Sequence, residues 1–273
     1  MTMKKMKNLL WMAALALTAA TMTACSNDEL QADEKPAQKD NVVTLVTTLS
    51  PKGGDTRALS DPGDGTITST WAVGEELHVD YKKSDDSGLA AKATVTSIDG
   101  SGNATITVDL VDPKDGGEID FNYPYSDAMF DLIEDNQIGT LDDISKNWDY
   151  CYGSGTLSVS GGTATLSGTV TMDRLTCIWK FSFTDGSTDI TSDITSLNIK
   201  VYISDLYQWN YTIIPSSLST IYLACYPNDK SGPATVTITA TTPSGTYKKT
   251  ASGITLYAGK MYTSTGLALS LVP

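Results

Sequence analysis

Residues 197–203 read Leu-Asn-Ile-Lys-Val-Tyr-Ile, and the apolar residues Leu197, Ile199, Val201 and Ile203 occupy every second position. Side chains two residues apart point to the same face of an extended strand, so the pattern predicts a strand with one face on a core and the other in water. The same alternation recurs in residues 43–49, 77–81, 106–110, 119–123, 178–183, 236–238 and 267–271. The sequence therefore predicts an all-β protein.

Clusters of Gly, Asp, Asn, Ser and Pro separate these segments, as in residues 61–65, 99–103 and 112–117. Such residues supply the positive or preset φ angles that tight turns require. No long helical stripe competes with the strands, although residues 126–146 could hold a short helix.

Many short antiparallel strands at this spacing are typical of β-sandwiches. Two sandwiches fit the length of the chain, which has 273 residues. We expect an N-terminal domain over residues 42–170 and a C-terminal domain over residues 171–273, with the boundary before the apolar strand that starts at Leu175.

The first 24 residues have the features of a secretory signal peptide. Lysines at positions 4, 5 and 7 precede an apolar run over residues 9–20, which is too short to span a membrane. Met22-Thr23-Ala24-Cys25 follows and resembles a bacterial lipobox, in which the cysteine is acylated and cleavage leaves it as the first residue. We expect residues 1–24 to be removed and Cys25 to carry the lipid, such as palmitate. The alternative is an ordinary signal peptide with an incidental cysteine.

Residues 25–41 are polar and charged, which predicts a flexible tether. Ser26-Asn27-Asp28-Glu29 within it resembles the acidic surface-export tag of Bacteroides-type lipoproteins. We therefore expect a lipid-anchored precursor on the outer membrane at the cell surface. The chain would contact the membrane only through the lipid on Cys25.

The chain is acidic, with a formal net charge of −13 at pH 7, and removal of the lysines in the signal makes it more negative. Such a chain repels nucleic acid and anionic lipid head groups, so we expect no nucleic-acid partner. Three cysteines remain after Cys25, namely Cys151, Cys177 and Cys225. An odd number cannot all pair within one chain. One disulfide is possible in an oxidising compartment, and three buried thiols are the alternative.

Residue types that carry catalysis or bind metals are scarce. The one histidine, His78, lies in an alternating segment where we expect it to face water, and no Gly-x-Ser-x-Gly motif occurs. Neither a His/Cys cluster with zinc spacing nor a phosphate-binding glycine loop is present. Residues 112–120 carry four carboxylates that could hold calcium, but they lack EF-hand spacing, and a solvated turn explains them better. We expect no enzyme, no metal and no cofactor.

Aromatic residues gather in two stretches, and aromatic faces can stack on sugars. The stretches contain Tyr123, Tyr125, Trp148, Tyr150 and Tyr152, and then Tyr207, Trp209 and Tyr211. Tyrosines in β-sandwiches more often pack against strands or line the ends of loops. Glycan binding is therefore a second interpretation of these residues.

Five segments, in their order along the chain, resemble the fimbrillin family, the lipoprotein-derived type V pilins of Bacteroides-like bacteria. They are Asp-Thr-Arg-Ala at 55–58, Trp-Ala-Val-Gly-Glu-Glu-Leu at 71–77, Phe-Asn-Tyr-Pro-Tyr-Ser at 121–126, residues 172–181, and Tyr-Ala-Gly-Lys-Met-Tyr at 257–262. The family often has a histidine where this chain has Asp173 and Arg174, so the match is loose there. The resemblance implies two tandem, mainly antiparallel β-sandwich domains of the transthyretin-like type.

The resemblance also implies an assembly mechanism. In the family, a trypsin-like protease cuts a lipidated precursor after an arginine behind the first strand, which corresponds here to cleavage between Arg57 and Ala58. The first strand then leaves a groove that the C-terminal strand of another subunit fills, and Leu267, Leu269 and Leu271 would share the face that enters it. Lys52 is a second trypsin-type site. The simpler alternatives are that Arg57 is a solvated loop residue and that the C-terminal strand is an ordinary edge strand.

Two function classes follow. The first is a structural and adhesive fimbrial subunit whose partners are other fimbrial subunits, the maturation protease and a glycan or protein receptor. The second is a glycan-binding lipoprotein that stays monomeric and anchored at the outer surface. A hydrolase is poorly supported, because no acid–base pair can be selected from the 32 scattered carboxylates.

Overall fold

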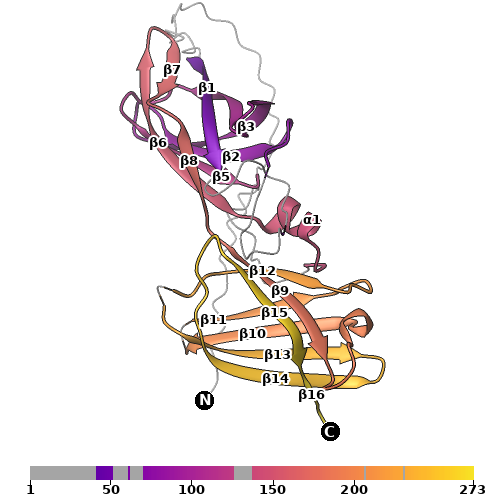
Figure 1. Ribbon diagram of the computed structural model, residues 1–273. Helices are drawn as coiled ribbons and strands as arrows, with labels where there is room; N and C mark the ends of the chain where they lie inside the picture. The colour runs from indigo at the N-terminus through magenta and orange to yellow at the C-terminus, as the bar shows by residue number, and fades with distance from the viewer. Residues whose placement is uncertain (1–40, 52–60, 62–69, 126–136, 206, 230) are drawn as a thin grey trace, which may run out of the picture. The chain divides into compact units, whose positions relative to one another are not determined.

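The computed structural model describes residues 41–51, 61, 70–125, 137–205, 207–229 and 231–273 (Figure 1). The predicted signal peptide, nearly all of the predicted tether, Cys25, Arg57 and Ala58 lie outside these residues. The regular secondary structure of the described part is almost entirely β-strand, which confirms the predicted all-β class. None of its helices is both long enough and apolar enough to cross a membrane.

Eight strands form the first sheet. They are β1 (Val42–Pro51), β2 (Glu76–Lys82), β3 (Gly88–Ile98), β4 (Ala104–Val111), β5 (Glu118–Tyr123), β6 (Cys151–Ser160), β7 (Thr163–Leu166) and β8 (Val170–Arg174). Their order is β4-β3-β2-β5-β6-β7-β1-β8, and β1 also pairs with β4 while β6 also pairs with β8. The sheet therefore closes on itself, and its inner face encloses one hydrophobic core.

The remaining strands form two sheets, of five and three strands. They are β9 (Cys177–Thr184), β10 (Ser196–Ser204), β11 (Tyr207–Ile213), β12 (Ile221–Cys225), β13 (Ala234–Thr242), β14 (Gly245–Ile254), β15 (Met261–Ala268) and β16 (Ser270–Leu271). One sheet has the order β11-β10-β13-β14-β16 and the other β12-β9-β15. Both contribute buried residues to a second core, as expected for a β-sandwich.

The period-two pattern accounts for these strands. Leu197, Ile199 and Val201 on β10 are at most 3% exposed, whereas Asn198 and Lys200 between them are more open to solvent. Turn chemistry fixes the register of the hairpins. Between β3 and β4, the carboxylate of Asp99 accepts hydrogen bonds from backbone N–H groups later in the same turn. The local sequence thus sets both the strands and their nearest connections.

The short helix expected within residues 126–146 is one turn, α1 (Leu141–Asp143), which continues as a π-helical turn over Ile144–Trp148. The hydroxyl of Thr140 accepts a hydrogen bond from the backbone N–H of Asp143 and caps the turn. The part of the predicted helix at residues 126–136 lies outside the described residues.

The two cores divide the chain later than the boundary expected between residues 170 and 171. β8 pairs with β1 and β6, and its Val170 and Met172 belong to the first core. The second core takes up the chain at Cys177, and it also includes Ile144 and Tyr150 from the segment before β6. β8 therefore completes the first sheet, and the apolar strand expected from Leu175 is β9, which belongs to the second core.

Candidate functional site

β1 lies inside the first sheet, with a paired strand on each side. Along one side it pairs antiparallel with β4, in a continuous register from Val42 opposite Val111 to Leu49 opposite Ala104. Along the other side it runs parallel to β8 and β7, where Leu45 is opposite Ala164. β1 thus closes the sheet between β4 on one side and β7 and β8, which follow each other along its other side.

The inward face of β1 is apolar and fully covered. Val43, Leu45 and Leu49 are at most 1% exposed, whereas Val42 and Val46 on the outer face are 56% and 57% exposed. Burial of a large aliphatic side chain contributes roughly 1.5–3 kcal/mol, so these three together contribute roughly 5–9 kcal/mol. Loss of β1 would expose the inward residues of β4, among them Ile106 and Leu110, and would open a groove along the sheet.

The C-terminal segment divides between two sheets. β15 runs parallel to β9, a bulge follows Ser264, and the two residues of β16 then pair with β14. Leu267 is half-buried against the second core, Leu269 is 3% exposed in that core, and Leu271 is 59% exposed. Within the folded subunit the three leucines therefore do not share one face, because the backbone changes sheets between them. The face expected of a donated strand stays a prediction.

Both C-terminal strands lie at sheet edges. Among the described strands, β15 pairs with β9 alone and β16 pairs with β14 alone. An edge strand has one row of backbone hydrogen-bonding groups that no neighbouring strand uses. Its removal breaks a single ladder, whereas removal of β1 breaks the ladders on both of its sides.

Segments that carry the family resemblance meet in space. The rings of Trp71 and Tyr123 pack edge to face with centroids 5.6 Å apart, and the hydroxyl of Tyr123 donates to Glu75 Oε1 at 2.9 Å. In the C-terminal half, the carbonyl of Lys260 accepts from the N–H of Ile178 at 3.0 Å. The resemblance therefore follows residues that pack together and hold strand ends in place.

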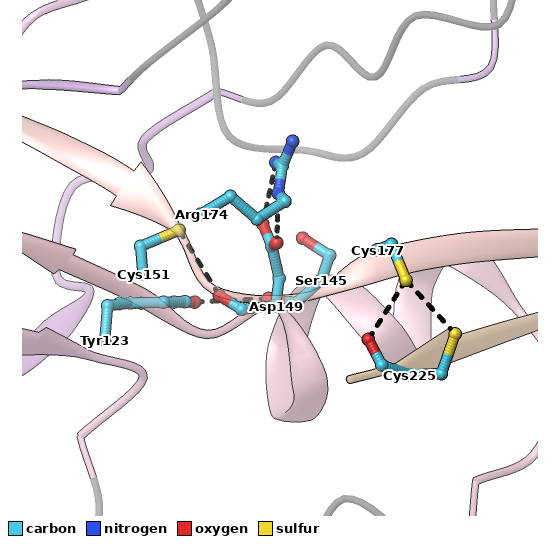
Figure 2. A network of polar contacts seen from close by, with 7 residues as sticks. All are labelled: Tyr123, Ser145, Asp149, Cys151, Arg174, Cys177 and Cys225. Carbon is cyan, nitrogen blue, oxygen red and sulfur yellow. Dashed lines mark hydrogen bonds and ion pairs between the residues drawn. The ribbon is translucent and has the colours of Figure 1, made fainter. Parts of the chain in front are cut away.

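A buried ion pair that the sequence analysis did not predict stands at the end of β8 (Figure 2). Arg174 Nε lies 2.5 Å from Asp149 Oδ1 and Nη2 lies 3.0 Å from Oδ2, with the two side chains 6% and 0% exposed. Burial lowers the pKa of Arg174, but the Asp149 carboxylate outweighs it and leaves that pKa above its ordinary value. The pair is next to the chain's passage from β8 to the second core. The sequence feature that could have predicted this ion pair was a single arginine, Arg174, in line with the buried residues Val170 and Met172 of β8.

The strands around β8 approach closely at Gly153 on β6. A Cβ atom at Gly153 would lie 2.7 Å from both the carbonyl oxygen of Thr171 and the sulfur of Met172. At Gly155 the nearest atom would be a methyl group of Leu166 at 3.3 Å. The first glycine is required for the contact between β6 and β8, whereas the second leaves a flexible side chain room to adjust.

His78 is half-buried and not open to water as expected. Its side chain is 13% exposed, with Nε2 placed 3.1 Å from Asp80 Oδ1 and the ring 5.9 Å from that of Tyr125. Within the described ranges, no three His, Cys, Asp or Glu side chains gather as a metal site would require. In the acidic loop at 112–120, the carboxylate of Asp115 accepts from the N–H of Val159 and that of Asp120 from Tyr152. These contacts give the carboxylates a structural role.

Three of the eight aromatic residues singled out for glycan stacking are core residues. Tyr123, Tyr150 and Tyr211 are at most 4% exposed. Trp209 on β11 is half-buried, with its ring 5.8 Å from that of Tyr226, and it lines a hollow of about 600 Å³ over β10, β11 and β13. The exposed amide side chains of Gln208 and Asn210 and the ammonium group of Lys200 also line this hollow. The hollow therefore combines an aromatic ring with hydrogen-bonding groups.

Neither a family model nor a curated protein matches this chain. Solved structures do match. The chain is similar in structure to fimbrial proteins. A fimbrial protein from Bacteroides ovatus aligns over 84% of this chain and 51% of its own, with 15% identity and a TM-score of 0.38, so this chain spans about half of its length. A fimbrial assembly protein from Parabacteroides distasonis aligns over 83% and 90% of the two chains, with 11% identity and a TM-score of 0.44.

A candidate cell adhesion protein from Bacteroides uniformis aligns over 86% of this chain and 97% of its own, with 12% identity and a TM-score of 0.46.

Proposed function

We propose that this chain is a structural and adhesive subunit of a cell-surface fimbria that assembles by strand exchange. The precursor is lipidated on Cys25 and reaches the outer membrane, where a trypsin-like protease cuts after Arg57. β1 then leaves with the lipid, and the C-terminal strand of another subunit takes its place. The partners are other fimbrial subunits, and a glycan or protein receptor on the host or bacterial surface.

The observation that carries this proposal is the position of β1. The strand closes a sheet that is otherwise complete, and residues 52–57, with both candidate cleavage sites, follow it directly. While the chain is intact, β1 is present at the high effective concentration of a tethered ligand. A cut behind it removes that advantage but leaves its buried side chains in place. The nicked subunit would therefore stay folded until a competing strand displaces β1.

The C-terminal strand has the properties of such a competitor. Its two parts, β15 and β16, lie at the edges of two sheets, so its departure breaks one ladder in each, with β9 and with β14. Leu267, Leu269 and Leu271 have the two-residue spacing that an extended strand needs to present one face. Val43, Leu45 and Leu49, the inward residues of the strand to be replaced, likewise lie an even number of residues apart. Leu271 is already exposed in the subunit, which makes it available for a first contact. Head-to-tail contacts of this kind do not close and so propagate a filament.

Mild trypsin treatment of the purified mature protein tests the proposal. We expect cleavage after Arg57, release of β1 and polymers on gel filtration, and we expect Arg57→Gln to remain monomeric. Lys52→Gln shows whether the earlier site contributes. Resistance of Arg57 to trypsin, or cleaved protein that stays monomeric, would overturn a role in a fimbrial shaft.

Two further variants separate an effect on insertion of the C-terminal strand into another subunit from an effect on folding. Leu271→Asp and Val272→Asp place the same charge at neighbouring residues that are both exposed in the subunit, so both proteins should fold. Neighbouring side chains of a donated strand point to opposite faces. We expect Leu271→Asp to block polymerisation after cleavage and Val272→Asp to permit it. Equal polymerisation by both would exclude Leu271 as a residue of the inserted face.

The hollow at Trp209 supports the alternative function, a glycan-binding lipoprotein that stays anchored and monomeric. A ring beside amide groups is a common arrangement for sugar recognition. Two results together would favour this alternative. The protein binds a glycan array, and Trp209→Ala abolishes this binding while Tyr207→Ala retains it. Trypsin does not convert the same protein to polymers.

A further inference from the structure

Two of the three cysteines after the lipidation site face each other across a pair of strands. Cys177 is the first residue of β9, Cys225 is the last residue of β12, and the antiparallel register places them directly opposite each other. Their sulfur atoms are 3.3 Å apart, and neither residue is more than 1% exposed. Figure 2 shows both side chains turned toward each other between the strands.

This placement satisfies the geometry of a disulfide bond. Residues directly opposite in an antiparallel pair have Cα atoms about 4.5–5.5 Å apart. Disulfides require about 4.4–6.8 Å between Cα atoms and about 2.0 Å between the sulfurs. The backbone is therefore already in range, and small side-chain rotations suffice to close the remaining distance.

The sequence directs the chain to a compartment where such bonds persist. The lysines before the apolar run at residues 9–20 predict export, and disulfides form in the bacterial periplasm and on cell surfaces. We propose that Cys177 and Cys225 form a disulfide bond in the exported protein. The two thiols lose two protons and two electrons as the S–S bond forms. A disulfide of a thiol–disulfide oxidant accepts these electrons and becomes two thiols.

The burial of the pair determines when the bond forms. The hydrogen bond between its thiol and Cys177 and its burial raise the pKa of Cys225 well above its ordinary value, and the thiolate is the attacking species in disulfide exchange. The folded, reduced protein therefore offers an oxidant neither access nor a thiolate. The bond forms while β9 and β12 are pairing, before the second core closes over the sulfurs.

The bond fastens β12 to β9 on the side of β9 opposite to β15. If the C-terminal strand leaves for another subunit, which rests on the proposed function, β9 keeps a covalently held neighbour in what remains of its sheet. The loop between the two cysteines spans 48 residues and contains β10 and β11. The bond therefore limits how far this part of the chain can open when its edge strand departs.

Peptide mapping of the exported wild-type protein tests the proposal without any variant. The protein is collected after secretion, denatured and alkylated without reductant, and digested with trypsin. We expect residues 175–180 and 201–230 as one linked peptide, with a mass two hydrogen atoms below the sum of its parts, which separates on reduction. The peptide of residues 147–174, which contains Cys151, should not be part of that link.

Alkylation of both Cys177 and Cys225 in the unreduced sample would overturn the proposal, and so would a link from either of them to Cys151. This result is independent of polymerisation. A linked peptide in a protein that never polymerises would refute the fimbrial proposal alone, and polymers with both thiols alkylated would refute the disulfide alone.

Discussion

Truncation of Leu45 to alanine tests whether β1 is held mainly by its inward face. Leu45 is at the middle of β1, opposite Val108 on β4 and Ala164 on β7, and none of its surface is exposed. Removal of a fully buried leucine side chain costs the lost transfer free energy and leaves a cavity, in total about 2–5 kcal/mol. Tight pairing on both sides of β1 limits relaxation of the backbone, so we expect about 3 kcal/mol.

The assay is urea unfolding of the intact protein, and Val46→Ala is the matched control. Val46 is the next residue on the same strand, but it is 57% exposed, so its truncation should change the unfolding free energy by about 0.5 kcal/mol or less. The reasoning predicts a loss of about 3 kcal/mol for Leu45→Ala beside a nearly unchanged control. Equal effects of the two substitutions would refute the assigned orientation of β1.

The same pair of variants gives a kinetic prediction after cleavage. Once the chain is cut behind β1, a loss of about 3 kcal/mol corresponds to roughly 100-fold weaker retention of the strand. Release of β1 should be faster from cleaved Leu45→Ala than from cleaved Val46→Ala. Gel filtration and mass spectrometry of the separated fractions measure this release. Equal release rates would show that the inward face does not control departure of the strand.

Three further predictions concern the buried ion pair, the contact between β6 and β8, and a surface carboxylate. Arg174→Met leaves its carboxylate partner buried without a counter-charge and should lower the unfolding free energy by about 3–5 kcal/mol, whereas a loss below about 1 kcal/mol would show that water reaches the pair. Gly153→Ala should cost about 1–3 kcal/mol in urea unfolding because β8 must move, and Gly155→Ala should cost less; the reverse order would contradict the contact between β6 and β8. Hydrogen bonds from the side chain and backbone of Thr191 lower the pKa of Asp189, so its contribution to stability is present above an unfolded-state pKa of about 3.9 and is lost as pH falls through the folded-state value. Unfolding midpoints measured from pH 7 to pH 2 should therefore fall less steeply at the acid end in Asp189→Asn than in the wild type, and identical profiles would exclude this contribution.

Local patterns predicted the strands but not all of their partners. The alternation at residues 197–203 and 106–110 predicted β10 and β4, because exposure of every second residue is a property of the strand itself. The pairing of β1 with β7 and β8 joins segments more than 100 residues apart, and no local pattern encodes which edge β1 closes. The ion pair between Asp149 and Arg174 was missed for the same reason, since each residue alone has the appearance of a solvated charge.

The sequence by itself determined the all-β class, the turns and the net negative charge, because each of these depends on residue type and short-range spacing. The export signal is a prediction made on the same basis. The tertiary structure decided the closure of the first sheet by β1 and the facing of Cys177 and Cys225. It also decided the different environments of Leu269 and Leu271, the first buried in the second core and the second exposed, although both occupy alternate positions of the same sequence pattern. These features depend on which distant strands pair and on where the backbone passes from one sheet to another. Packing of the whole chain selects among such pairings. The local sequence of one strand does not specify which distant strand it pairs with.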